Sequence, residues 1–553
     1  MVMRGGTLRY VGHGDVDHLD PACANYTASA VIERAYTRQL VTYPSTSDPD
    51  RAGTLIADMA TEVPTRDNGR ISADGRVYTF TVRDGVCWDT PSPRPVTAAD
   101  VVRGIKRLAG PVGRCPLLQY YADSIAGMAE FCAGMAAVPA RADAIARYLE
   151  NHDVPGLRAV DERTVRFELV APTPDFLDML TLPFASAAPV EYLEHLPAGP
   201  DFDRSLRSNG PYRVVTHRPG ETIVLERNPA WRPESDPVRG QHVARIEVLM
   251  GRSQDEACAE VAAGTADALW DVAPPAGDVT PAQRVTARTG ELNPCLLINM
   301  VSPNAGGATR RVEVRRALHY AVDRTAIARI YGGAAEAATQ LLPPGNPAYR
   351  PSDLYRTGDP SGDPDRARQL LADAGYTDGL TLRMIHRDTG HHPAVGAAIR
   401  DALARAGIHV ELVPVPHADF YPKYLEVAQN ARDGVWDITT QGWLPDWQGN
   451  NARSYLQPHF DSSRVAEESA TWGACYGFYR NPATSDLIHS AGTAAEARDA
   501  NELYHRAEQQ ILRDAAVVPL LFQSSATMYA ERVRGITTFP NYLGDPTQMS
   551  VLS

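Results

Sequence analysis

The chain has 553 residues, of which 44% are hydrophobic and 22% charged, and its formal net charge is −13. This length exceeds what one hydrophobic core supports, so several lobes are expected. The acidic balance argues against nucleic acid as a partner, because nucleic acid attracts basic surfaces; an acidic field attracts cationic ligands instead.

No apolar run reaches the roughly 18 residues that a membrane-spanning helix needs. The N-terminus, MVMRGGTLRY, has no hydrophobic signal region and leads directly into a strand-like pattern. We therefore expect the start of a mature domain, which leaves the cellular compartment open.

The first half of the chain is dominated by predicted strands. Alternating apolar and polar residues predict them at 7–12, 77–82, 164–170, 212–217, 222–227 and 244–250. A helix is expected over 97–110, with Thr97 as its N-cap, Asp100 at the third helical position and Gly110 at its end.

In the second half, helices alternate with strands. The segment 363–376 predicts a helix that is capped by Asp363, has Pro364 in its first turn and stops at Gly375. Both 391–415 and 314–333 predict a helix followed by a strand. The whole pattern favours an α/β protein of at least two lobes. No long flexible linker is present, so we expect the lobes to be joined by crossing strands that form a hinge.

Motifs for catalysis and metal binding are missing. No His-Glu-x-x-His or Gly-x-Ser-x-Gly sequence occurs, and neither lysine, Lys106 or Lys423, has a serine three residues before it. His391 and His392 are adjacent, which is typical of two solvated loop histidines rather than of a metal site. The seven cysteines are scattered without a Cys-x-x-Cys pair, so mostly buried thiols are expected, with one or two disulfides left open. We expect no cofactor, no metal and no enzyme activity.

The stretch QGWLPDWQGN, residues 441–450, places Asp446 between Trp443 and Trp447. Glycines and a proline interrupt it, so local preference disfavours a helix there. Such an acid could move a proton, hold a metal or receive a cation.

Six blocks of the sequence, in order, resemble one family. They are GGTLRYV…LDP (5–21), 78–108, 208–231, 312–333, 363–382 and 507–523. Together they resemble the bacterial extracellular solute-binding proteins of family 5, the peptide-binding proteins of ABC importers. More narrowly, they resemble the oligopeptide-binding proteins encoded among clavulanic acid biosynthesis genes.

The resemblance implies an α/β fold of the class II periplasmic-binding-protein type, with two lobes, three domains, a hinge and an interlobe ligand cleft. One lobe would combine a discontinuous domain, 1–45, 190–275 and 522–553, with an inserted domain, 46–189. The other lobe would be 276–521. The resemblance also implies an extracytoplasmic location and a monomer, with membrane contact only through the transporter or a lipid anchor that this chain lacks. Without a signal peptide in the chain, the cytoplasm stays open.

In this family an aspartate after a Gly-Trp pair receives the α-ammonium group of the ligand, so the resemblance makes Asp446 the anchor and Trp443 a wall of the cleft. A carboxylate that is buried on closure needs a cation, because an unpaired buried charge costs several kcal/mol, and the indoles of Trp443 and Trp447 could add cation–π attraction. The alternative is that Asp446 only caps a turn between two core tryptophans.

Main-chain hydrogen bonds to an extended peptide would tolerate many sequences. The resemblance points to two ligand-lining segments as candidate strands, Thr440–Gln441–Gly442–Trp443 in the second lobe and Asn25–Tyr26–Thr27 in the first. Side-chain pockets could be lined by Tyr120, Phe420, Trp472, Tyr476 and Phe522; for each of these five, an ordinary core or rim position is the alternative.

The sequence thus predicts a non-enzymatic protein that binds peptides or peptide-like metabolites through a free amine and hands them to an ABC transporter permease. The acidic balance suggests ligands that contain arginine. Two alternatives stay open: a binder of nickel, haem or sugar with the same fold, and an enzyme recruited to a peptide or β-lactam pathway.

Overall fold

The computed structural model describes residues 5–113, 115–199, 201–274, 284–331, 335–463, 474–537 and 544–552. The chain divides into two compact units. Unit 1 comprises Met1–Ala287, Trp447–Gly449 and Ala526–Ser553, and unit 2 comprises Arg288–Asp446 and Asn450–Ser525. Two boundaries between the units therefore lie at 287/288 and 525/526. From the sequence we expected lobe boundaries at 275/276 and 521/522. The further division of unit 1 into a discontinuous and an inserted domain stays a prediction.

Unit 1 contains a five-stranded mixed sheet. Its strands, in spatial order, are β12 (Ala268–Trp270), β1 (Thr7–Gly12), β11 (Arg245–Leu249), β10 (Thr222–Arg227) and β9 (Tyr212–Arg218). β1 runs parallel to β11 and β12, and β10 is antiparallel to its neighbours. The helices α1 (Thr27–Tyr36) and α8 (Gln254–Ala262) contribute to the same core. β1 ends at Gly12, where a Cβ atom would lie 1.6 Å from the carbonyl oxygen of Trp270, so only glycine fits.

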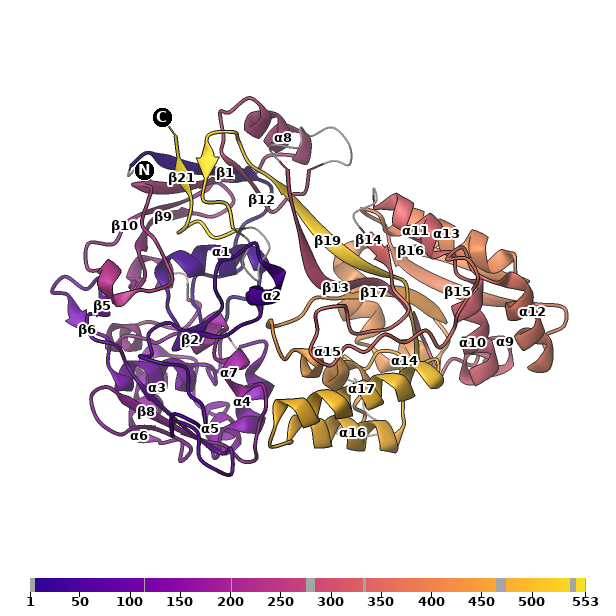
Figure 1. Cartoon of the computed structure of the whole chain (residues 1–553), viewed down its shortest axis with the longest axis horizontal. Helices are drawn as coiled ribbons and strands as arrows, with labels where there is room; N and C mark the ends of the chain where they lie inside the picture. The colour runs from indigo at the N-terminus through magenta and orange to yellow at the C-terminus, as the bar shows by residue number, and fades with distance from the viewer. Residues whose placement is uncertain are drawn as a thin grey trace. The chain divides into compact units, whose positions relative to one another are not determined.

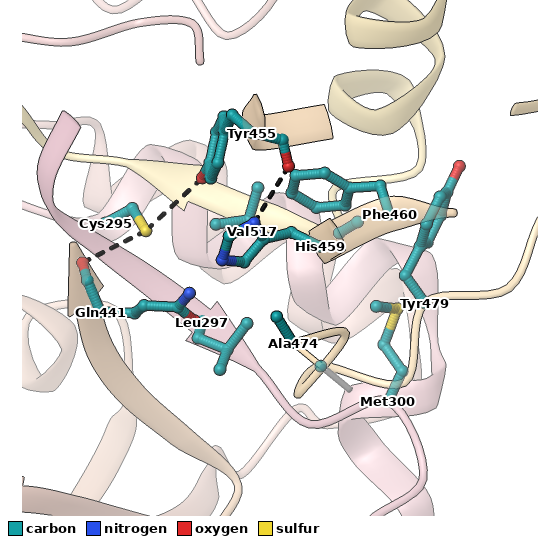
Figure 2. A pocket seen from close by; sticks show the side chains of 12 residues that line it. Cys295, Leu297, Met300, Gln441, Tyr455, His459, Phe460, Ala474, Tyr479 and Val517 are labelled. Carbon is teal, nitrogen blue, oxygen red and sulfur yellow. Dashed lines mark hydrogen bonds between the residues drawn. The ribbon is translucent and has the colours of Figure 1, made fainter. Parts of the chain in front are cut away.

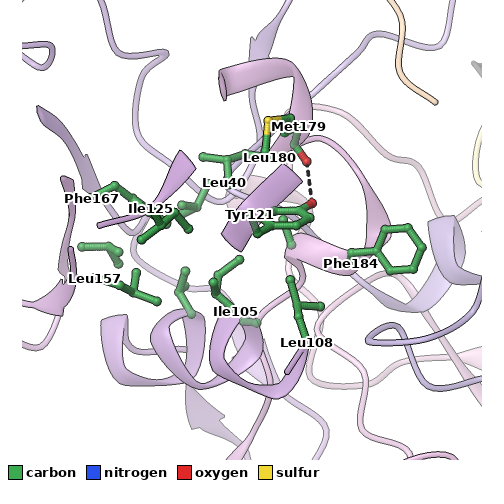
Figure 3. Close-up of a cluster of buried hydrophobic side chains, with 14 of the residues drawn as sticks. Leu40, Ile105, Leu108, Tyr121, Ile125, Leu157, Phe167, Met179, Leu180 and Phe184 are labelled. Atoms are coloured by element: carbon green, nitrogen blue, oxygen red, sulfur yellow. Dashed lines mark hydrogen bonds between the residues drawn. The ribbon is translucent and has the colours of Figure 1, made fainter. Parts of the chain in front are cut away.

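A second core of unit 1 lies under the antiparallel sheet of β4 (Val77–Thr81), β8 (Thr164–Glu168) and β7 (Leu157–Ala159). Figure 3 shows its apolar side chains, among which the Tyr121 hydroxyl donates to the Met179 carbonyl oxygen at 2.9 Å. The helices here are α3 (Ala98–Arg107), α4 (Leu118–Ser124), α5 (Met128–Met135), α6 (Ala142–Asn151) and α7 (Phe176–Met179). The predicted cap of α3 is confirmed, because Thr97 and Asp100 form a reciprocal capping box.

The remaining elements of unit 1 are short. They are β2 (Val41–Thr42), α2 (Pro49–Ala52), β3 (Ile56–Ala57), β5 (Cys87–Trp88), β6 (Arg94–Pro95), β20 (Val533–Arg534) and β21 (Ser550–Val551). Between these elements lies a fully buried set of charges. Arg38 Nε and Arg239 Nη1 each donate to the carboxylate of Asp58 at 2.8 Å, and the second carboxylate, Asp236, lies beside both guanidinium groups.

Unit 2 is built on a seven-stranded sheet (Figure 1). The order is β14 (Ala335–Ala337), β19 (Leu521–Met528), β13 (Arg284–Ile298), β17 (Ile438–Trp443), β15 (Leu380–Arg387) and β16 (Ile408–Val415), and β18 (Val517–Pro519) also pairs with β13. β17, β15 and β16 are parallel. Their carboxyl ends therefore meet at one edge of the sheet.

The helices of unit 2 pack around this sheet. They are α9 (Asn304–Gly307), α10 (Val312–Ala321), α11 (Arg324–Ile330), α12 (Pro364–Asp373), α13 (His392–Ala404), α14 (Ala428–Arg432), α15 (Ala452–Phe460), α16 (Pro482–Gly492) and α17 (Ala497–Arg513), with a π-helix at Phe420–Leu425. The predicted helix and strand of 391–415 are confirmed as α13 and β16, and Asp363 caps α12 as predicted.

The strand expected at the end of 314–333 is wrong. The segment forms α10 and then a second helix, α11, because the Asp323 side chain accepts a hydrogen bond from the Ala326 N–H at 2.8 Å. This N-cap satisfies a backbone donor that a helix start otherwise leaves open. Since Thr325 and Ile327 favour strands, the local preference was overridden by the cap.

Candidate functional site

The predicted ligand-binding strand Thr440–Trp443 is confirmed as part of β17. One side of β17 pairs with β13 through Leu296↔Thr440 and Cys295↔Gln441. On the other side the pairing with β15 covers only Ile438 and Thr439. β15 continues beyond this point alongside β16, so β15 and β17 diverge toward their carboxyl ends. On that side, the residues of β17 after Thr439 lie beyond the pairing with β15, which is the arrangement that the addition of an extended chain requires.

Alternate side chains of β17 point into the core of unit 2. Trp443 is 5% exposed and stacks on Tyr455 of α15, with ring centroids 4.5 Å apart. Gln441 lies on the same face of the strand, because side chains two residues apart point the same way, and it is also 5% exposed. Gly442 lies against Asn293, whose side chain would be 2.6 Å from an added Cβ. Trp443 was expected to be a wall of the cleft; the structure instead buries it against α15, and its contact with ligand stays a prediction.

Asp446 lies three residues after the end of β17. It is partly exposed in a bend, and the predicted absence of a helix here is confirmed. Pro445 and Gly449 bracket this bend, and the chain returns to helix only at Ala452. Asp446 therefore sits beyond the carboxyl end of β17, on the edge of the sheet where β15 and β17 diverge.

Trp447, the second indole of the motif, belongs to unit 1, whereas Asp446 belongs to unit 2. Its side chain is 2% exposed within the core that surrounds β4 and β8, and it makes an edge contact with Tyr120, with centroids 5.1 Å apart. The next carbonyl, of Gln448, accepts a hydrogen bond from the Tyr43 hydroxyl at 2.8 Å. Trp443 and Trp447 thus belong to two different cores, and the contribution of both indoles to one cation site stays a prediction.

The predicted strand at Asn25–Thr27 is wrong. Thr27 is the first residue of α1. The N–H groups of Asn25 and Tyr26 already donate to the carboxylate of Asp17, at 2.7 and 3.2 Å. Because those donors are used, this segment cannot offer them to a peptide as a strand would. Tyr26 is nevertheless 60% exposed, so contact between its side chain and a ligand stays a prediction.

The predicted pocket aromatics occupy different environments. Phe420 is 1% exposed, and its ring carries the guanidinium of Arg387 at 4.6 Å, so Phe420 belongs to the core. Tyr476 is partly buried and contacts Tyr421, with centroids 5.8 Å apart. Phe522 is partly buried on β19, opposite Glu336 of β14. Trp472 lies outside the described residues.

Arg387 is a candidate that sequence reasoning missed. It is the last residue of β15, and its Cζ lies 4.6 Å from the Phe420 ring centroid and 5.2 Å from that of Tyr421. Nη2 donates to the Tyr421 hydroxyl and Nη1 contacts His392 Nε2, both at 3.1 Å. Among the described residues no carboxylate pairs with this guanidinium. From the sequence we predicted no strand over 380–387, so no expected element drew attention to this arginine.

The neighbours of Arg387 are held neutral. Burial, assisted by the charge of Arg387, lowers the pKa of His392 to about 4, and burial raises the pKa of Tyr421. We expected His392 to be a solvated loop histidine. It is instead a partly buried residue in the first turn of α13. The arginine is oriented by two neutral acceptors and two rings. A guanidinium held in this way is suited to receive a planar carboxylate through two parallel hydrogen bonds.

Several other features bear on the chemistry. Within the described part of the chain, His, Cys, Asp and Glu side chains form no group of three or more that could hold a metal ion. All seven cysteines lie in the described ranges and none of them forms a disulfide; Cys23, Cys115, Cys295 and Cys475 are buried. No helix in the described ranges has the length and apolarity needed to cross a membrane.

Comparisons with known proteins give one family. The model of the bacterial extracellular solute-binding proteins, family 5 (middle region), matches residues 54–466. Periplasmic oligopeptide-binding protein OppA of Salmonella typhimurium is 25% identical over 484 residues, 84% of this chain and 80% of the relative. The probable deoxycholate-binding periplasmic protein YgiS of Escherichia coli is 25% identical over 528 residues, 93% of this chain and 88% of that protein.

Among solved structures, clavulanic acid biosynthesis oligopeptide binding protein 2 superposes with a TM-score of 0.85 at 26% identity, covering 100% of this chain and 96% of the other. The predicted fold class and the resemblance stated from the sequence blocks are confirmed by these matches.

Proposed function

The chain belongs to the bacterial extracellular solute-binding proteins of family 5, and on that premise we propose that it captures short peptides or peptide-like metabolites by a free amine and delivers them to an ABC transporter permease. It acts outside the cytoplasmic membrane, as a monomer and without catalysing a reaction. The observation that carries the proposal is the stretch Thr440–Trp443 of β17, which pairs with β13 on one side, lies beyond the pairing with β15 on the other, and ends three residues before Asp446. A main-chain edge beside a carboxylate fits an extended peptide with an ammonium terminus.

Asp446 receives the ammonium group in this proposal. A charge-assisted hydrogen bond is stronger than a neutral one, and each main-chain hydrogen bond along β17 adds about 1 kcal/mol net. A micromolar complex requires about 8 kcal/mol, so the anchor and several main-chain bonds are of the right magnitude. The motif thereby explains affinity without selecting the peptide sequence.

The test of the anchor is isothermal titration with one short peptide in free and N-acetylated forms. We expect acetylation to weaken binding to the wild-type protein at least tenfold, about 1.4 kcal/mol. Asp446→Asn should weaken binding of the free peptide by a similar factor and leave binding of the acetylated peptide unchanged. Thermal melts of both proteins check the fold. Equal affinities of the two peptides for the wild-type protein would refute the ammonium assignment.

Arg387 receives a carboxylate of the same ligand. It stands at the carboxyl end of β15, on the sheet edge that β17 shares, and lacks an acidic partner among the described residues. Amidation of the peptide C-terminus, or Glu→Gln in its side chains, identifies which carboxylate is bound. We expect one of these changes to reduce affinity about tenfold for the wild-type protein and not for Arg387→Gln.

A matched control for Arg387 is available on the same strand. Arg383 is an exposed arginine of β15 whose Nε lies 3.3 Å from Glu411. Arg383→Gln should keep the wild-type discrimination between acid and amide ligands. If Arg387→Gln keeps it too, Arg387 does not bind the carboxylate.

The preference for arginine-containing ligands rests on the net charge of −13. Titration with peptides that differ only by arginine or leucine tests it, and equal affinities would exclude it. A second ligand class is favoured by the likeness to YgiS together with the aromatic setting of Arg387: an amphipathic carboxylate. Competition between deoxycholate and a bound peptide separates the two classes, because only a carboxylate binder of that kind would release the peptide.

A further inference from the structure

A small cavity lies beneath β17, on the face of the sheet that α15 covers. Its volume is about 10 Å³, and its lining residues with polar side-chain atoms are Cys295, Gln441, Tyr455, His459 and Tyr479 (Figure 2). A cavity of roughly 10–15 Å³ on this measure holds one water molecule, provided that two or more polar groups face it. The cavity is therefore of the size for one water and too small for any organic ligand.

The Gln441 amide is one of the groups that face the cavity. Its side chain is nearly fully buried, and its Oε1 accepts no hydrogen bond from the described residues. Leaving a buried amide unsatisfied costs about 1–3 kcal/mol. The main-chain carbonyl oxygen of Gln441 does have a partner, because it accepts a hydrogen bond from the Cys295 thiol at 3.3 Å. The side-chain Oε1, by contrast, lacks a hydrogen-bond donor, which a single water molecule would supply.

His459 faces the cavity from α15. Its Nδ1 lies 3.0 Å from the carbonyl oxygen of Tyr455, and because a carbonyl only accepts, Nδ1 carries the proton. Burial lowers the pKa of His459 to about 4, so the ring is neutral at physiological pH and Nε2 is an acceptor. No described residue donates to this nitrogen. Figure 2 shows the ring and the Gln441 amide pointing toward one another across the cavity.

We propose that one water molecule occupies this cavity and bridges the Gln441 side chain to His459 Nε2, and that this bridge positions β17 for ligand. A water can donate to Nε2 and still exchange a hydrogen bond with either end of the amide, so the bridge holds for both orientations of Gln441. The second half of the proposal rests on the proposed function, because it assigns ligand to β17.

The position of His459 on α15 explains why the bridge acts on the strand. His459 lies one turn after Tyr455, and residues four apart share a helix face. Tyr455 stacks on Trp443, and His459 faces Gln441, so two successive turns of α15 support two same-face residues of β17. Gln441 and His459 are positioning residues: they act on the strand and not on the ligand.

The water itself is tested by a crystal structure of the wild-type protein at a resolution that shows ordered solvent. We expect one water within hydrogen-bond distance of His459 Nε2 and the Gln441 amide. A cavity without density, or one closed by direct contact between the two side chains, would overturn the proposal. This test does not depend on ligand, so it separates failure of the water site from failure of the proposed function.

The positioning role is tested by a double-mutant cycle with Gln441→Met and His459→Phe, which keep side-chain size and remove the polar atoms. Each variant should raise the Kd for a free-amine peptide about fivefold, and the double variant should bind no worse than either single one, because either change removes the same bridge. The control is His409→Phe, the same substitution at an exposed histidine of β16, which should leave the Kd unchanged.

Two outcomes would overturn the positioning role: losses that multiply in the double variant, and single variants that bind like the wild-type protein. Melting temperatures show whether a variant has lost its fold. A wild-type protein that contains the water but binds no peptide would instead refute the proposed function and leave the water site standing.

Discussion

The buried charges of unit 1 allow a sharp stability prediction for Asp58→Asn. Asp58 is 0% exposed and accepts from Arg38 Nε and Arg239 Nη1, each at 2.8 Å. Asparagine has the same shape but presents an NH2 group to one of the two guanidinium groups, so a donor would face a donor. The substitution also leaves Asp236 beside both buried guanidinium groups without the charge of Asp58.

The size of the expected destabilisation follows from the cost of removing one partner of a buried ion pair. Removal of one partner leaves an uncompensated charge and typically costs about 3–5 kcal/mol. Arg38 and Arg239 each lose a carboxylate contact of 2.8 Å and keep the longer contacts to Asp236, at 3.5 and 3.6 Å, so we expect a loss within this range. Urea unfolding followed by circular dichroism measures this loss of stability. The urea concentration at the midpoint should fall, while the slope of the unfolding free energy against urea concentration stays unchanged.

An exposed ion pair in the same unit provides the control. Arg70 Nε lies 2.8 Å from Glu62, with side chains 36% and 43% exposed. Glu62→Gln should cost at most about 1 kcal/mol, because solvent screens such pairs. If Asp58→Asn costs no more than this control, the buried network does not stabilise unit 1 as its geometry indicates.

Two further predictions concern unit 1. Burial alone would lower the pKa of His217, but the hydrogen bond and charge of Asp203, at 2.5 Å, together with Asp15, raise it above its ordinary value. The ion pair therefore contributes its full stabilisation below about pH 6.5, the pKa of histidine in the unfolded chain, and this contribution is lost as pH rises through the folded pKa. Urea unfolding across this window should show a free energy of unfolding that falls in the wild-type protein and not in His217→Gln. An equal fall in both proteins would contradict the prediction. Gly104→Ala should lower the melting temperature although alanine favours helices by about 1 kcal/mol, because the new Cβ would lie 2.0 Å from the Ser186 carbonyl oxygen; a higher melting temperature would contradict this packing.

Local signals accounted for much of the fold. The strands at 7–12 and 222–227 were predictable because alternation depends only on neighbouring residues, and the caps at Thr97 and Asp363 were predictable because a cap and its helix are adjacent. The strand expected at the end of 314–333 failed because the Asp323 cap went unrecognised. The segment at Asn25–Thr27 failed for a different reason: the carboxylate of Asp17 draws its N–H groups into a helix start, which no local pattern announces.

The motif around Asp446 made the candidate acid visible in the sequence, and the family with it, because both are patterns of residue type and order. The sequence could not place Arg387 at the same sheet edge, since the pairing of β15 with β17 joins residues more than 50 positions apart. It could not assign Trp443 and Trp447, four residues apart, to two different cores. Residue order determines which local structures form; their long-range packing, which depends on how much apolar surface each core can bury, decides which side chains meet.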